Sequence, residues 1–159
     1  MDLYETYSAD IYRFTFWLTG DGHQAEDITS ETLIRTWTNR NKIRTETLKA
    51  YILTIARNIF LEQNRKQKHQ VPLDNLHSDP SPGPDKMLES RLELQRIQII
   101  LQGLTETDRT AFILRVFQDL PYEEIARILE LSQSAVKVKV HRVRRKIMAD
   151  YMHKEVFKS

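Results

Sequence analysis

The 159-residue sequence contains no cysteine, so disulfide bonds and thiolate metal sites are excluded. None of its five histidines has the paired spacing of a metal site on one helix, and we expect neither a metal nor a cofactor. No apolar run approaches the ~20 residues of a membrane span, and residues 1–5 are too acidic to begin a signal peptide. These absences predict a cytosolic protein without direct membrane insertion.

Glycine and proline are scarce, with four and five copies, and strand signals are nearly absent. Four of the five prolines fall between Val71 and Pro84, together with two serines and one glycine. Such a segment cannot form a core and is typical of a flexible linker. The sequence therefore predicts an all-α protein with two small helical bundles, residues 1–70 and 87–159, joined by a Pro-rich linker at 71–86.

Apolar residues recur with a helical period in the first part of the chain. Residues 4–18 predict one helix, which Gly20-Asp21-Gly22 ends. A second helix is expected from about Ala25 to Arg40, and a third from about Thr45 toward His69. The residues expected to face the core of this bundle from the second and third helices are Ala25, Ile28, Leu33, Trp37, Leu48, Ile52, Ile55 and Ile59.

The helical period resumes at Met87 and continues to Leu104. Thr105 to Asp108 resembles a capping box and predicts the start of another helix. Pro121 fits the first turn of a short helix, because the missing N–H costs nothing there. Ser132 then offers a side-chain oxygen to cap a final helix, so the sequence predicts a helix-turn-helix between Leu120 and Ile147.

The final predicted helix has two different faces. Val136, Val140, Val143 and Ile147 share a narrow sector, which predicts the buried side. The segment from Lys137 to Lys146 holds six Lys or Arg residues and no acid. The side chains expected to point outward are Ser134, Val138, His141, Arg142 and Arg145, with Lys137, Arg144 and Lys146 on the flanks. This pattern is typical of a DNA recognition helix, and a merely solvated basic face is the alternative.

Charge is unevenly distributed along the chain despite a net charge of only +2. Residues 1–40 hold seven acids and three bases, whereas residues 41–70 hold seven bases and two acids. This asymmetry indicates separate faces for different partners, one acidic and one directed at nucleic acid.

Three stretches together resemble the extracytoplasmic-function sigma factors, the smallest bacterial sigma factors. Ala25 to Trp37 is similar to the family's second-region helix. Leu48 to Asn58, followed by Arg65 and Lys66, is similar to its promoter-melting segment. Leu104 to Arg145 is similar to its fourth region, and the predicted linker lies where the family has one.

The resemblance implies a protein that binds core RNA polymerase and promoter DNA and so directs transcription initiation. It places one contact, with the clamp helices of the polymerase beta-prime subunit, on the outward side of the second helix. The residues implied for this contact are Asp27, Glu31, Thr32, Leu33 and Arg35. A solvated face is the alternative for each of them. The family also implies an inhibitory partner, an anti-sigma factor, and no small-molecule substrate.

The resemblance further implies that Asn58 lies at a turn between two helices and receives a flipped base of the opened minus-ten element. An amide suits this role because it both donates and accepts hydrogen bonds. The residues implied for strand stacking and phosphate contacts are Tyr51, Arg57, Arg65 and Lys66.

For the minus-thirty-five duplex, the implied contacts are Ser134, Lys137, Val138, Lys139, His141, Arg142 and Arg145. Phosphate contact is the commoner role for the cations, and Val138 suits a thymine methyl group. Glu130 stands in the helix-turn-helix turn where the family frequently has glycine. If this residue is left-handed, the strain is about 1 kcal/mol.

Two other functions fit parts of the pattern. One is a conventional helix-turn-helix regulator with a helical sensor domain, which predicts tight binding to a palindromic operator without polymerase. The other is an adaptor that has lost promoter activity. An enzyme is not expected, because the sequence has no nucleophile elbow, phosphate loop or convergent carboxylate pair.

Overall fold

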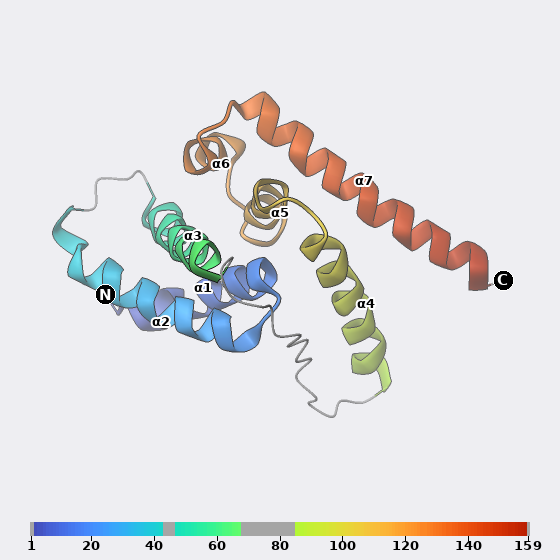
Figure 1. The fold of residues 1–159 in the computed structure, drawn as a ribbon, viewed down its shortest axis with the longest axis horizontal. Helices are drawn as coiled ribbons and strands as arrows, with labels where there is room; N and C mark the ends of the chain where they lie inside the picture. The colour runs from blue at the N-terminus through green and yellow to red at the C-terminus, as the bar shows by residue number, and fades with distance from the viewer. Residues whose placement is uncertain (1, 43–46, 68–84, 159) are drawn as a thin grey trace. The chain divides into compact units, whose positions relative to one another are not determined.

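The computed structural model describes residues 2–42, 47–67 and 85–158, and the elements in these ranges are helices joined by turns (Figure 1). The chain divides into two compact units, residues 1–79 and 80–159. The predicted all-α class, with two helical bundles and a helix-turn-helix in the second, is confirmed. The predicted linker lies outside the described residues as far as residue 84, and its last two residues begin a helix.

The first unit opens with two helices joined by a tight turn. Helix α1 spans Leu3–Thr19, and the Asp2 carboxylate caps it by accepting hydrogen bonds from the first backbone amides. Gly20, with φ of 72°, ends α1 in the left-handed conformation that glycine adopts without strain. Asp21 then caps α2, which spans Gly22–Thr38. The predicted break at residues 20–22 is therefore confirmed.

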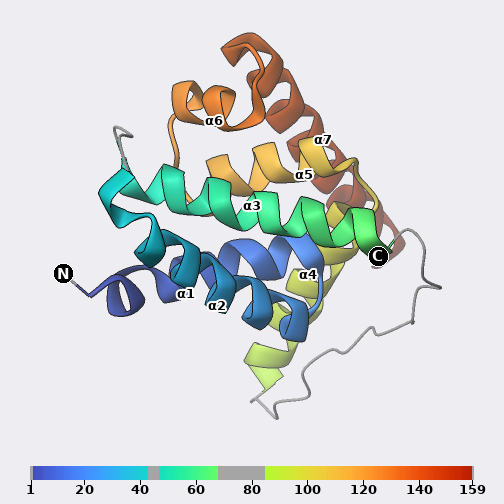
Figure 2. The same cartoon turned by 60° about the vertical axis from the view of Figure 1, so that its left-hand side comes forward.

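A 3₁₀ turn, η1, follows at Arg40–Lys42, and α3 spans Leu48–Gln67. Helices α1, α2 and α3 pack side by side around one apolar core (Figure 1 and Figure 2). The large side chains fully buried in this core are Ile11, Phe14, Leu18, Ile28, Ile52, Leu53 and Ile59.

The face that α2 buries differs from the prediction. Leu33 is half-buried and Trp37 is 55% exposed, whereas Thr29, Thr32 and Thr36 are buried. Each of these hydroxyls donates to the carbonyl four residues earlier, at 2.6–2.7 Å. Because the hydroxyl is satisfied within the helix, the threonine methyl groups can pack like small apolar residues. The prediction of Leu33 and Trp37 in the core was therefore wrong.

In the second unit, α4 spans Asp85–Gln102 and α5 spans Glu106–Phe112, with a π-helical turn, η2, at Ile113–Phe117. Helix α6 spans Tyr122–Leu129 and α7 spans Gln133–Lys158. The large side chains fully buried in this unit are Leu101, Ile113, Leu114, Ile125 and Val136.

Side-chain caps define the turns of the second unit. The Thr105 hydroxyl accepts from the Asp108 amide at 3.3 Å, and the Ser132 hydroxyl accepts from the Ala135 amide at 3.1 Å, so both predicted caps are confirmed. Pro121 precedes α6 as its N-cap and does not lie in the first turn. Glu130 ends α6 with φ of 56° and ψ of 46°, the left-handed conformation considered above.

A buried arginine closes the end of α4. The Arg109 guanidinium donates from Nε to the Leu101 carbonyl at 2.8 Å and from Nη2 to the Leu104 carbonyl at 3.1 Å. The last carbonyls of a helix lack partners within the helix and carry partial negative charge, so a cation stabilises them. Burial lowers the pKa of Arg109 below its ordinary value. This contact fixes α5 against the end of α4.

Candidate nucleic-acid and partner interfaces

Helix α7 presents the two faces that its sequence predicts. Val136, Val140 and Val143 are buried against the rest of the second unit, and Ile147 is half-buried. The exposed side chains along the same segment are Ser134, Lys137, Val138, His141, Arg142, Arg144, Arg145 and Lys146. The apolar stripe thus anchors the helix and leaves a cationic face accessible, as a helix entering the DNA major groove requires.

Lys139 departs from this pattern. Its ammonium lies 2.8 Å from the Asp108 carboxylate, and the two side chains are 23% and 11% exposed. Lys139 is therefore turned toward α5 and neutralised within the unit, unlike the exposed Lys137 and Arg142. This pairing could not be predicted from the helical wheel, because the carboxylate comes 31 residues earlier in the chain. The implied contact of Lys139 with DNA stays a prediction.

Tyr122, the first residue of α6 within the helix-turn-helix, contacts two cations. The Arg115 guanidinium lies 4.2 Å from the centre of the Tyr122 ring, and the Lys137 ammonium lies 5.6 Å from it. Arg115 also donates to the Leu120 carbonyl at 3.2 Å. Cation–π contacts of this kind restrict long side chains that would otherwise sample many rotamers. Arg115 and Tyr122 were missed from the sequence because neither belongs to the cationic run.

The candidate strand-binding residues all lie on α3. Asn58 is exposed in the middle of an unbroken helix, so the expected turn at this residue was wrong. An exposed mid-helix asparagine costs only a few tenths of a kcal/mol, which burial of Ala56, Ile59 and Phe60 around it outweighs.

Seven-residue spacing places Tyr51, Asn58 and Arg65 on one side of α3. Asn58, Arg65 and Lys66 are exposed, and Tyr51 and Arg57 are half-buried. Arg57 lies on a different side of the helix from Asn58, about 100° away. The helix therefore offers an amide and two cations to a partner, with an aromatic ring in line with them.

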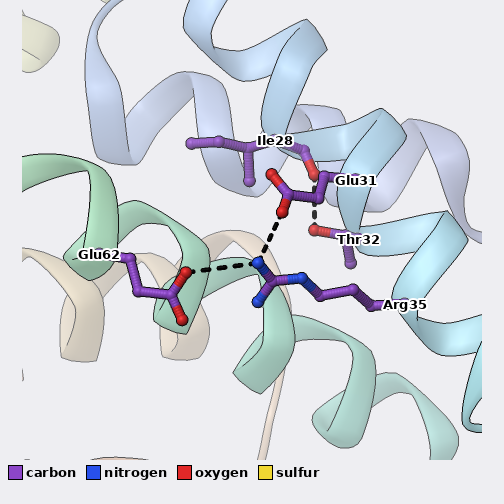
Figure 3. Close-up of polar contacts among 5 residues, drawn as sticks. All are labelled: Ile28, Glu31, Thr32, Arg35 and Glu62. Carbon is purple, nitrogen blue, oxygen red and sulfur yellow. Dashed lines mark hydrogen bonds and ion pairs between the residues drawn. The ribbon is translucent and has the colours of Figure 1, made fainter.

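The candidate partner-binding residues of α2 divide between surface and core. Asp27 is exposed, and Glu31, Leu33 and Arg35 are half-buried. Thr32 is fully buried, and its hydroxyl donates to the Ile28 carbonyl at 2.6 Å (Figure 3). Direct contact of Thr32 with a partner is therefore incompatible with this fold, and that prediction was wrong.

Arg35 links α2 to α3 through two carboxylates (Figure 3). Its Nη2 donates to Glu31 at 2.6 Å and to Glu62 at 3.3 Å. The hydrogen bond to Glu62 is the largest effect and raises the pKa of Arg35, burial opposes it, and the hydrogen bond to Glu31 and the charges of both carboxylates raise the pKa further. The Glu31–Arg35 pair follows the four-residue helical spacing, but Glu62 was missed because it comes from another helix.

An open apolar pocket lies between α2 and the start of α1. Leu33 and Trp37 line this pocket of about 380 Å³ together with Asp2, Leu3 and Tyr4 from the start of α1. Tyr4 and Trp37 are exposed, and the Arg40 guanidinium stacks 4.1 Å from the centre of the Trp37 ring. Carboxylates on α2 beside the exposed rings of Tyr4 on α1 and Trp37 on α2 are features of a protein-binding surface.

The described helices include none with the length and hydropathy that crossing a lipid bilayer requires.

The helix-turn-helix with its accessible cationic helix defines a DNA-binding protein, and the first helical unit carries a different surface on α2. Comparison with known families is consistent with this division. Residues 3–70 match the family model for sigma-70 region 2, and residues 94–147 match that for sigma-70 region 4.

Two curated relatives are ECF RNA polymerase sigma factors of Bacillus subtilis. SigM is 29% identical over 156 residues, which cover 94% of this chain and 93% of SigM. SigX is 30% identical over 149 residues, covering 88% of this chain and 77% of SigX. The sigma factor RpoE of Bartonella quintana, solved in complex with the anti-sigma factor NepR, has the same fold, with a TM-score of 0.76, 24% identity and 92% coverage of both chains.

The chain therefore belongs to the extracytoplasmic-function (ECF) sigma factors, and it is an alternative sigma factor that directs transcription initiation. This membership decides against the conventional regulator considered from the sequence. The family is not one of classical enzymes.

Proposed function

We propose that the chain binds core RNA polymerase through its first unit and holds the minus-thirty-five element of a promoter through α7 of its second unit. The observation that carries the proposal is the two-sided packing of α7, with Val136 and Val143 buried and Lys137 and Arg142 exposed. Phosphate contacts from the cations set the register of such a helix, and side chains at its centre reach the base edges. Ser134, Val138 and His141 are the proposed base readers, and Arg145 is a proposed phosphate contact.

The polymerase contact is proposed for the outward side of α2. Asp27 and Glu31 provide negative charge, and Leu33 provides an apolar contact beside the Trp37 pocket. Arg35 completes this surface as a cation held between two carboxylates. Opposite charges across such a contact mainly set register and association rate, while the apolar centre contributes affinity. The clamp helices of the beta-prime subunit are the proposed partner.

The opened minus-ten strand is proposed to lie along α3. Asn58 is exposed and can pair with the edge of an unstacked base, and Arg65 and Lys66 can neutralise phosphates. Tyr51 lies in line with Asn58 and offers a ring for stacking, although part of it is buried. Because α3 is unbroken, a base would be captured against the side of a helix.

An inhibitory protein partner is also proposed. RpoE of Bartonella quintana, which shares the fold, was solved bound to the anti-sigma factor NepR. An anti-sigma factor for this chain would compete with polymerase by covering the same exposed surfaces. We further propose that the chain works in the cytoplasm and catalyses no reaction of its own.

Run-off transcription with purified core polymerase on genomic fragments tests the function and reveals the promoter. We expect discrete transcripts only when both the chain and the core enzyme are present. A gel shift with the same fragments should show specific binding only with polymerase. Specific binding by the chain alone, or no selection of start sites, would contradict the proposal.

A further inference from the structure

The cations of α7 do not all have the same environment. Lys139 is held by Asp108, whereas Lys137 and Arg142 on the same segment are exposed. At 23% and 11% exposure, the two charges are largely withdrawn from water. A pair of this kind contributes little net stability compared with apolar side chains, but removing one partner leaves the other charge uncompensated. Its place in the fold indicates a role other than stability.

Asp108 lies in the first turn of α5, and hydrogen bonds on both sides of it hold this turn in place. Its amide donates to the Thr105 cap at 3.3 Å, and a negative charge in the first turn of a helix is favoured by the helix dipole. The next residue, Arg109, is buried and bonded to the end of α4. The Asp108 carboxylate is therefore attached to a part of the second unit that has little freedom to move.

Lys139 lies at the edge of the buried stripe of α7, next to Val140 and one turn from Val136 and Val143. The adjacent residue, Val138, is 53% exposed on the proposed DNA-facing side. An apolar stripe alone permits small rotations and axial shifts of a helix, because apolar contacts are not directional. An ion pair beside the stripe restricts both, since its geometry depends on the positions of two specific atoms.

We infer that Asp108 and Lys139 are positioning residues that fix the rotation and depth of α7 relative to α5, and that Lys139 stays paired with Asp108 when DNA is bound. This inference rests on the proposed function of α7. The proposed base readers, Ser134, Val138 and His141, reach only a short distance from the helix. A displacement of α7 by about 1 Å would therefore weaken their contacts with base edges. Asp108 therefore contributes to promoter affinity although it carries the same charge sign as DNA.

The alternative, in which Lys139 contacts DNA, predicts a different effect of Asp108→Asn on promoter affinity. If Lys139 releases Asp108 and contacts a phosphate in the complex, Asp108→Asn removes a competing acid and promoter binding stays equal or becomes tighter. If the pair positions α7, Asp108→Asn weakens binding, by about tenfold for a coupled pair of this kind. The sign of the Asp108→Asn effect thus separates the two interpretations.

The probe is the genomic fragment that gives the strongest run-off transcript with the wild-type chain, bound by the complex of full chain and core polymerase. Affinity is measured over a series of KCl concentrations for Asp108→Asn, Lys139→Met and the double variant. We expect the double variant to lose no more than either single variant, because both remove the same pair. We also expect the slope of log affinity against log salt to stay at the wild-type value for all three.

Lys137→Met is the matched control, since it removes the same charge from an exposed position two residues away. If Lys137 contacts a phosphate, this variant lowers the salt slope by about one. Its effect should add to that of Asp108→Asn. If Lys137→Met leaves promoter affinity and the salt slope unchanged, the proposed DNA-facing side of α7 is contradicted. If Lys137→Met weakens binding while Asp108→Asn binds like the wild type, only the positioning inference is overturned.

Loss of folding is separated from loss of position by two measurements. Binding to a duplex without promoter activity should be unchanged in the variants, because exposed cations supply it. The double variant leaves neither charge unpaired, so it should fold even if a single variant does not. Lys139→Arg, which keeps the positive charge, should retain most promoter binding. A drop of about one in the salt slope of the double variant would show that Lys139 contacts DNA and would overturn the inference.

Discussion

Replacing Glu130 by glycine should stabilise the second unit. Glu130 ends α6 in the left-handed conformation, with φ of 56° and ψ of 46°. Its neighbour Leu131 donates a backbone hydrogen bond to the Ala126 carbonyl at 3.0 Å, the pattern that usually has glycine at the left-handed position. The side chain of Glu130 is exposed, so its removal costs no buried contact.

The expected gain follows from two opposing effects. Relief of the left-handed strain is worth about 1–2 kcal/mol, and the greater freedom of glycine in the unfolded chain offsets about 0.4–1 kcal/mol. The net change is a stabilisation of about 0.8 kcal/mol. For a unit of this size, this raises the midpoint of thermal unfolding by about 3–6 °C. Thermal unfolding of the full chain, followed by circular dichroism, measures this shift.

Two variants show whether backbone strain is the cause. Glu130→Ala removes the charge but keeps Cβ, so it should give no comparable gain. Asp119, with φ of 60°, is a second left-handed residue, and Asp119→Gly should stabilise less because aspartate tolerates this conformation better. Backbone strain at Glu130 is excluded as the cause if Glu130→Ala is as stable as Glu130→Gly, or if Glu130→Gly is no more stable than the wild type.

Three further predictions concern single side chains. Arg109→Met removes two buried hydrogen bonds from a charged donor and should destabilise the second unit by about 3 kcal/mol in urea unfolding, whereas an unchanged midpoint would contradict the role of Arg109 at the end of α4. Thr32→Val keeps the buried shape, so co-elution with core polymerase should not change; loss of co-elution from a folded variant would mean direct contact. Val138→Ala should weaken promoter binding. Replacing the contacted thymine by uracil, which lacks only the methyl group, should abolish the difference in affinity between the wild-type chain and this variant. A difference that persists on every uracil-substituted fragment would exclude the methyl contact.

Helical periodicity was sufficient to predict much of this fold. The burial of Val136, Val140 and Val143 follows from a repeat that lies within one helix, and the exposure of Arg142 follows with it. The caps at Thr105 and Ser132 are equally local, because a hydroxyl and an amide three residues apart define them. Such features depend on neighbours in the sequence and are therefore readable without the structure.

The sequence was least informative where a distant partner decides the environment of a side chain. The pairing of Lys139 with the Asp108 carboxylate could not be predicted, because nothing near Lys139 in the sequence indicates it. Glu62 was missed for the same reason, since its partner Arg35 lies on another helix. On α2, hydropathy favoured Trp37 for the core over Thr36, although a threonine bonded to its own helix packs closely at little cost.

The cationic side of α7 is proposed to select the promoter while the first unit binds the polymerase. Run-off transcription by core polymerase saturated with the Arg142→Glu chain separates these two roles when co-elution is measured on the same sample. We expect normal co-elution and no promoter-specific transcript. Start-site selection at the wild-type level by this variant would show that the cationic side of α7 does not select the promoter.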